Sequence, residues 1–128
     1  MAGNSDNYHE PYELLSSETR DWHRGVVSVM EELEAIDWYQ QRAEACGDEE
    51  LRSILLHNRD EEIEHAMMGL EWLRRQSPKV DEMARTYLFT EGPIVGREKA
   101  ATAGEATDRA SAAPAVGCLG IGSLRGTT

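Results

Sequence analysis

Two carboxylates and one imidazole in this sequence have the types and the spacing to bind a metal ion together. Glu62 and His65 form a Glu-x-x-His motif, and Glu32 lies in an earlier segment. Residues three apart share one face of a helix, so the carboxylate and the imidazole of the motif would point the same way. Oxygen ligands with one imidazole favour iron or manganese over thiolate-preferring metals, although the order of affinities alone leaves zinc open.

The motif alone is a weak signal, because the chain has 24 acidic residues and four histidines. The alternative interpretation makes Glu62 a solvated helix residue and His65 an interface histidine. The position of Glu32 relative to them decides between the two interpretations, and that position depends on the helices.

The first helix is predicted to begin near Ser16 or Ser17, whose hydroxyls can cap its exposed amides. It should end at Gly47 in a left-handed conformation. Along it, spacings of three and four connect residues that form one seam with Glu32 in its middle: Trp22, Gly25, Val29, Glu32, Ile36, Tyr39, Ala43 and Cys46.

The second helix is predicted to begin at Asp48, which can cap it, and to end at Ser77-Pro78. A shorter third helix should reach about Phe89. The seam of the second helix contains both members of the motif: Leu51, Leu55, Asn58, Glu62, His65, Gly69 and Trp72.

The two seams bring the carboxylates to one level. Glu32 precedes Gly47 by as many residues as Glu62 follows it, so in an antiparallel hairpin both lie about 22 Å from the turn at ~1.5 Å per residue. A ferritin-like bundle binds two metal ions with a Glu from each of two helices and Glu-x-x-His from each of the other two. One copy of this chain supplies half of that set, and a two-fold dimer would supply all of it.

The predicted fold class is therefore all-α. It is an antiparallel two-helix hairpin plus a short C-terminal helix, completing a ferritin-like four-helix bundle by dimerisation, with a disordered C-terminal tail. Residues 1–15 should be a flexible N-terminal segment and residues 16–91 the helical part. From residue 92 the chain is rich in glycine and alanine and has no aromatic residue, so it is predicted to be a flexible tail.

The charge of the chain limits its partners. A formal net charge of −11 argues against nucleic acid and anionic membranes, which both require a basic surface, and suits cations instead. Two cysteines give no disulfide framework, which is consistent with a reducing compartment. We expect no secretory signal and no membrane span.

Three segments, MEELEAIDWYQQR, HNRDEEIEHAMMGLEWLRR and RTYLFTEGPI, closely resemble the encapsulated ferritins, ferritin-like cargo proteins of encapsulin shells. The resemblance covers roughly residues 10–95. It implies dimers that assemble into a decameric ring, and two Fe ions per dimer bound at the subunit interface by Glu32, Glu62 and His65, with Glu62 bridging the ions.

The resemblance also implies two further sets of residues. Glu31 and Glu34 match an outer metal site for calcium or another divalent cation, and the alternative there is a solvated acidic face. Tyr39, with its neighbour Trp38, matches an aromatic pair beside the iron centre, and interface packing remains the alternative for both.

The segment LGIGSLR resembles the peptide that loads cargo into encapsulin shells, although a glycine-rich tail can produce such a segment by chance. The implied division is a linker at 92–118 and a targeting peptide at 119–125 within the tail 119–128. The residues of this targeting peptide are Leu119, Gly120, Ile121, Gly122, Ser123, Leu124 and Arg125. The resemblance thereby implies a cytoplasmic location inside an encapsulin nanocompartment, with the shell protein as partner.

The sequence hypothesis is a ferroxidase that oxidises Fe(II) with oxygen and delivers the product for mineral storage in the shell. Its catalytic residues would be Glu32, Glu62, His65 and Tyr39. Two alternatives remain open: a related di-metal enzyme that consumes peroxide, and a non-catalytic helical adaptor tethered by its tail.

Overall fold

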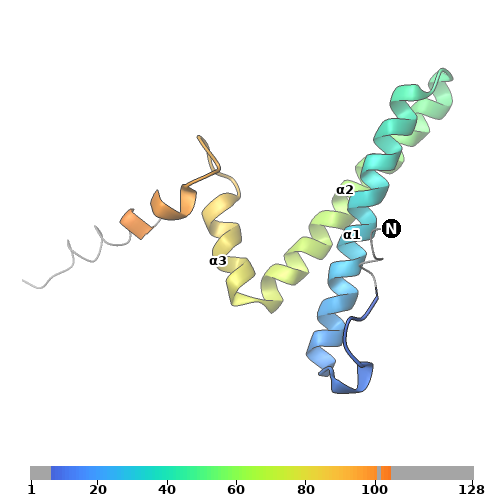
Figure 1. Cartoon of the computed structure of the whole chain (residues 1–128). Helices are drawn as coiled ribbons and strands as arrows, with labels where there is room; N and C mark the ends of the chain where they lie inside the picture. Colours follow the sequence, from blue (N-terminus) through green and yellow to red (C-terminus); the bar gives the residue numbers. More distant parts are fainter. Residues whose placement is uncertain (1–6, 101, 105–128) are drawn as a thin grey trace, which may run out of the picture. The chain divides into compact units, whose positions relative to one another are not determined.

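The structure, a computed structural model, describes residues 7–100 and 102–104 and contains only helices in that part of the chain. In chain order the elements are a 3-10 helix, η1 (Tyr12–Leu14), followed by α1 (Ser17–Ala45), α2 (Glu49–Gln76) and α3 (Pro78–Tyr87) (Figure 1). The chain divides into two units, Met1–Arg85 and Thr86–Thr128. The predicted all-α class is confirmed for the described residues.

The predicted N-terminal cap of α1 is confirmed, whereas the predicted conformation at its other end is wrong. The backbone amide of Thr19 donates to Oγ of Ser16 at 3.1 Å, which satisfies one of the free amides of the first turn. At the other end, Cys46 is extended with φ −80° and ψ 124°, and Gly47 does not have the positive φ expected of it. The chain therefore leaves α1 through extended residues rather than through a left-handed glycine.

The ends of α2 follow the sequence prediction. The amide of Leu51 donates to Oδ1 of Asp48 at 2.8 Å, and Ser77 ends the helix immediately before Pro78 opens α3. The Arg74 guanidinium binds Glu71 within α2 and Asp81 in α3. This ion-pair network joins the two helices on either side of their sharp junction.

Helices α1 and α2 run side by side as an antiparallel hairpin (Figure 1). Two glycines allow the close approach. A Cβ atom at Gly25 would lie 2.6 Å from the Trp72 ring, and one at Gly69 would lie 2.5 Å from Val29. Each glycine thus accepts a larger side chain from the opposite helix, which fixes the register between the helices.

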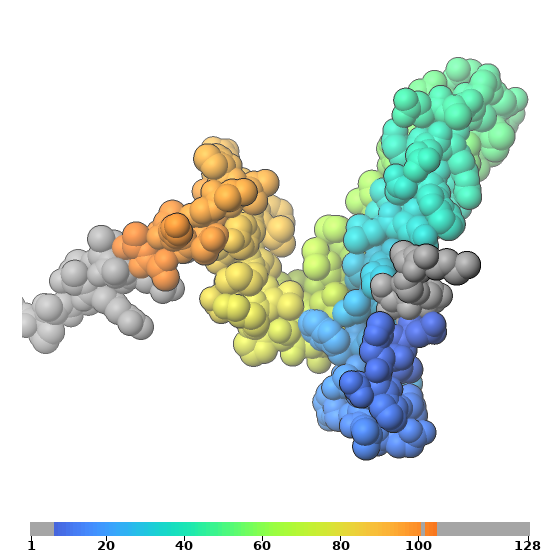
Figure 2. Space-filling view, in the orientation of Figure 1, coloured from blue at the N-terminus to red at the C-terminus, as the bar shows by residue number. Residues whose placement is uncertain are grey.

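Part of the N-terminal segment, predicted to be flexible, contacts the beginning of α1 (Figure 2). The Tyr8 ring lies against His23 with centroids 4.3 Å apart. The guanidinium of Arg20 lies 3.7 Å from the centre of the Tyr12 ring and donates to the Tyr12 carbonyl oxygen at 2.6 Å. These aromatic contacts hold the segment along the helix.

One chain buries little apolar surface. Among the described residues only Ala43, Ala66 and Leu73 are buried hydrophobic residues. Many large apolar side chains of the hairpin remain exposed: Met30, Leu33, Trp38, Leu51, Ile54, Ile63, Met67, Met68 and Trp72. Surfaces of this kind usually mark an interface with another protein or copy.

The second unit begins within the last turn of α3. The Tyr87 hydroxyl donates to the Glu98 carboxylate, and Nη1 of Arg97 donates to the Glu91 carbonyl at 2.8 Å. Residues 97–100 and 102–104 are helical, although they lie in the part predicted to be a flexible linker. The predicted targeting peptide, 119–125, lies outside the described residues.

No helix in the described part of the chain is both long enough and apolar enough to cross a membrane.

We expect Gly25→Ala to destabilise the hairpin by about 1–2 kcal/mol, because the new Cβ would overlap the Trp72 ring. The free-energy cost of this overlap should exceed the gain in helix propensity from replacing glycine by alanine. Thermal and urea unfolding would measure the change. Gly47→Ala is the matched control, since no atom lies within 4 Å of a Cβ there. Equal stability of the two variants would contradict the proposed close packing.

Candidate metal centre

Three side chains from α1 and α2 converge on one point. Glu32, Glu62 and His65 each offer a ligand atom, and these atoms all lie within 4.8 Å of one another. Nδ1 of His65 lies 2.9 Å from Oε2 of Glu62 and 3.9 Å from Oε2 of Glu32. Among the described residues, this is the group of His, Cys, Asp and Glu side chains that could bind a metal ion.

The register of the hairpin produces this cluster. Trp72 lies on Gly25, and Gly69 faces Val29 one turn nearer the cluster. Continuing along the hairpin, His65 and Glu62 come level with Glu32, and Arg59 reaches Gln40 with a 2.5 Å hydrogen bond beyond them. The predicted level position of Glu32 and the motif is therefore present in the fold.

The carboxylates of the cluster affect each other's protonation. A hydrogen bond with Glu62 raises the pKa of Glu32 above its ordinary value, and partial burial and repulsion add to the rise. The same hydrogen bond lowers the pKa of Glu62, and the hydrogen bond to His65 lowers it further. The two carboxylates thus compete for one proton, as expected for like charges held close together.

The pKa of the His65 imidazole is also shifted. Its hydrogen bond to Glu62 raises the pKa of His65, and the charges of Glu32 and Glu62 act in the same direction. When the imidazole is protonated, Nδ1–H donates to the ionised carboxylate of Glu62. The proton then occupies the lone pair of Nδ1 that a metal ion would need. Protons and metal ions would therefore compete for the cluster.

The cluster is only half enclosed by its own chain. The exposed fractions of the side chains are 44% for His65, 29% for Glu32 and 23% for Glu62. Two carboxylates and one imidazole fit the donor set of an iron or manganese site. Three residues cannot surround two ions, however, since the ferritin-like arrangement uses six.

The residues predicted for an outer site lie outside this cluster. Glu31 and Glu34 are both exposed on α1, and neither belongs to the three-residue group. Glu31 acts on the centre only through its charge, which adds to the rise in the pKa of Glu32. No described contact joins Glu31 to Glu34.

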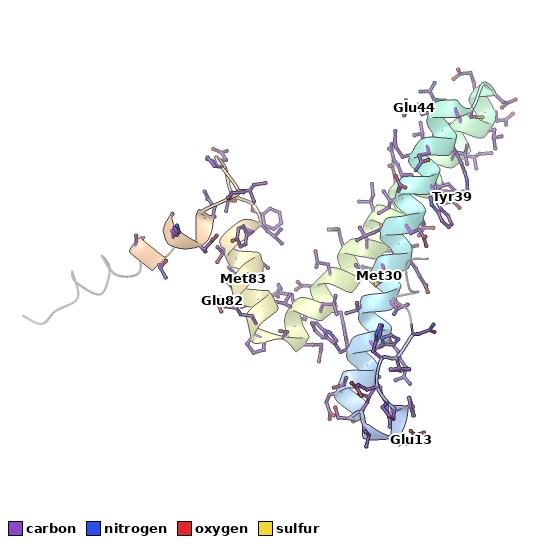
Figure 3. The ribbon with its side chains drawn as sticks, viewed as in Figure 1. Glu13, Met30, Tyr39, Glu44, Glu82 and Met83 are labelled. Carbon is purple, nitrogen blue, oxygen red and sulfur yellow. The ribbon has the colours of Figure 1, made fainter. Side chains whose placement is uncertain are left out.

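Tyr39 lies further along α1, between Met30 and Glu44 (Figure 3). It follows Glu32 by two helical turns, about 10 Å along the axis. The Arg42 guanidinium lies 5.4 Å from the centre of the Tyr39 ring and 6.0 Å from that of Trp38. The sequence prediction missed Arg42, although its spacing of three from Tyr39 indicates a shared face.

Comparison with known proteins gives one family. The EncFtn-like family model matches residues 7–91. An encapsulated ferritin-like protein from Rhodospirillum rubrum is 60% identical over 130 residues, covering 98% of this chain and 93% of the relative. A ferritin-like protein from Thermotoga maritima is 52% identical over 100 residues, covering 78% of this chain and 88% of the relative.

A solved structure is also similar. The crystal structure of a protein from Nitrosomonas europaea is 57% identical and has a TM-score of 0.68. The match covers 70% of this chain and 98% of that protein.

In the metal-stripped protein we expect His65 to titrate above its ordinary pKa of about 6.5. Because the folded-state pKa is raised, its ion pair with Glu62 stabilises the fold below about pH 6.5 and is lost as the pH rises through the folded-state value. NMR titration of the imidazole protons would measure this, and Glu62→Gln should lower the midpoint. Glu44→Gln, a change of an exposed glutamate elsewhere on α1, should leave it in place; equal effects of the two variants would contradict the pairing.

Proposed function

The chain belongs to the EncFtn-like family and is an encapsulated ferritin, and we propose that it is a ferroxidase that oxidises Fe(II) to Fe(III) at a di-iron centre shared between two copies. The observation that carries this proposal is the convergence of Glu32, Glu62 and His65 within 4.8 Å across the hairpin. The family membership supports iron as the metal, and the oxygen-rich donor set agrees with it.

A second copy would complete the centre. Two-fold symmetry doubles the cluster to four carboxylates and two imidazoles, which is the set that ferritin-like bundles use for two ions. The exposed apolar side chains of α1 and α2 support the same assembly, because a four-helix bundle would bury part of them. A decameric ring of such dimers remains part of the proposal.

The charge balance explains why iron would favour assembly. Four carboxylates contribute about −4 when ionised and two Fe(II) ions contribute +4, so the loaded centre is near neutral. Without cations the same dimer would hold like charges together. Ions that bind the dimer and not the separated chains shift the equilibrium toward the dimer.

The oxidation step balances with oxygen as the oxidant. Each of two Fe(II) ions gives up one electron, and dioxygen takes the two electrons and two protons to become hydrogen peroxide. The carboxylates and imidazoles of the two copies would bind both ions in one centre, so that both could give electrons to one oxygen molecule. Fe(III) then leaves as the precursor of a mineral.

We extend the proposal to the location of the protein and its partner. The R. rubrum relative is named as encapsulated, and LGIGSLR resembles a cargo-loading peptide. The protein would therefore work in the cytoplasm inside an encapsulin nanocompartment, oxidising iron that the shell stores. Glu31 and Glu34 would form an outer cation site, and Tyr39 would act beside the centre.

Removing any ligand of the centre should abolish catalysed iron oxidation. We expect Glu32→Ala, Glu62→Ala and His65→Ala each to reduce the initial rate of Fe(II) oxidation to that of iron in buffer, because each removes two of the six ligands of the dimer. Absorbance of Fe(III) after anaerobic loading and exposure to oxygen would measure the rate. Native mass spectrometry should give two irons per dimer for the unchanged protein.

Glu44→Ala is the matched control, since Glu44 is an exposed glutamate of α1 outside the cluster (Figure 3). It should oxidise iron at the unchanged rate. Unchanged rates in all three ligand variants would refute the ferroxidase proposal.

Changing the tail should separate loading into the shell from oxidation. We expect Leu119→Asp with Ile121→Asp to prevent co-purification with a co-expressed encapsulin shell, because the apolar side chains of the peptide would no longer fit an apolar groove. Fe(II) oxidation by the free protein should stay unchanged. Normal loading of this double variant would show that another surface carries the targeting signal.

A further inference from the structure

A hydrogen bond joins side chains of α1 and α2 between the metal cluster and the turn of the hairpin. Nη1 of Arg59 donates to Oε1 of Gln40 at 2.5 Å, and we call this contact the Arg59 clamp. Nε and Nη2 of the same guanidinium donate to Oδ1 of Asp60 at 3.0 and 2.6 Å. Because the guanidinium is planar and Asp60 binds one edge of it, the remaining nitrogen is directed at α1. The Arg59 side chain is only 26% exposed, which agrees with a fixed position.

The Arg59 clamp runs diagonally between the two helices. Gln40 precedes Gly47 by seven residues and Arg59 follows it by twelve, so their backbones lie about 10 Å and about 18 Å from the turn. Helical side chains lean toward the N-terminus of their own helix, so in an antiparallel pair these two side chains lean toward each other. A diagonal contact changes its length when the helices slide along each other. The clamp therefore resists a change of register.

The Arg59 clamp and the two glycine contacts lie on opposite sides of the cluster. The side chains packed on Gly25 and Gly69 fix the hairpin on the side away from the turn. Arg59 precedes Glu62 by about one turn of α2 and joins the helices on the side nearer the turn. The ligands of the centre are thus held level from both directions.

The Arg59 clamp also holds together two helix segments of like charge. Residues 28–40 and 55–69 contain eight Asp and Glu residues but a single Arg or Lys, which is Arg59. Without a bound cation these carboxylates repel each other across the hairpin. A hydrogen bond from a charged donor is stronger than one between neutral groups, so the contact of Arg59 with Gln40 offsets part of this repulsion.

We propose that Arg59 is a positioning residue of the metal centre, which through Gln40 keeps Glu32 and Glu62 level in the metal-free protein. This inference rests on the ferroxidase proposal above and adds a residue that prepares the centre for Fe(II). If only a fraction of the molecules has its ligands level, the apparent affinity for Fe(II) falls by that fraction. Once the ions are bound they hold the ligands themselves, so the maximal rate should depend little on Arg59.

Replacing Gln40 tests the clamp without changing the net charge. We expect Gln40→Ala to raise the Fe(II) concentration for half-maximal oxidation about fivefold, the effect of losing one typical hydrogen bond, with the maximal rate changed less than about twofold. Gln41→Ala is the matched control, because the Gln41 amide donates to Asp37 within α1 at 2.8 Å. It should leave both quantities unchanged, and equal effects of the two variants would overturn the proposal.

Replacing Arg59 separates positioning from charge in an anaerobic calorimetric titration with Fe(II). Loss of a positive charge beside eight carboxylates would by itself strengthen Fe(II) binding, whereas loss of the clamp would weaken it. We expect weaker binding by Arg59→Gln. Arg52→Gln makes the same change at an exposed arginine nearer the turn and should not weaken binding. Stronger binding by Arg59→Gln would show that its charge alone matters and would overturn the proposal.

The double variant tests whether the two residues act through one contact. Gln40→Ala combined with Arg59→Gln should bind Fe(II) no more weakly than Arg59→Gln alone, because both changes remove the same hydrogen bond. Additive losses in the titration would show that the two side chains act separately and would overturn the clamp.

The outcomes separate this proposal from the ferroxidase proposal. If the unchanged protein binds and oxidises two irons per dimer while Gln40→Ala and Gln41→Ala behave alike, only the role of Arg59 is overturned. If the unchanged protein takes up no iron, both proposals are overturned.

Discussion

Two carboxylates held together on neighbouring helices are the constraint around which this hairpin is built. Glu32 and Glu62 share a hydrogen bond that raises the pKa of Glu32 and lowers the pKa of Glu62. A fold keeps such a repulsive pair only if other contacts fix the register. Here Gly25 and Gly69 do so, because each receives a large side chain from the other helix. The proposed iron centre therefore depends on packing a few turns away from it.

The same hairpin is incomplete as a folded unit. It has almost no buried apolar side chains among its described residues, and its cluster offers three ligands on a half-exposed surface. Both shortages would be relieved by one event, the pairing of two copies. Apolar burial would then supply the association free energy, while the proposed metal ions would remove the repulsion at the centre. A chain of this design would link its own assembly to the presence of its substrate.

The sequence was sufficient to predict what depends on periodicity and caps. Counting residues from Gly47 placed Glu32 level with Glu62, because helical rise is nearly constant. It failed at Gly47 itself, since Cys46 leaves the helix in an extended conformation and Asp48 begins the next one directly. It also missed the packing of Tyr8 on His23 and of Tyr12 on Arg20, which depends on a segment folding back along α1. Contacts of this kind follow no regular spacing of residue types, so a pattern in the sequence does not predict them.

Tyr39 links the single chain to the proposed dimer. On a single chain its backbone lies two turns from Glu32, about 10 Å along the helix axis. A second copy would bring another Tyr39 toward the same two-fold axis. In a two-fold symmetric interface each residue is present twice, once from each copy. In the proposed dimer α1 of each copy would then supply both a ligand, Glu32, and an aromatic ring beside the centre, Tyr39.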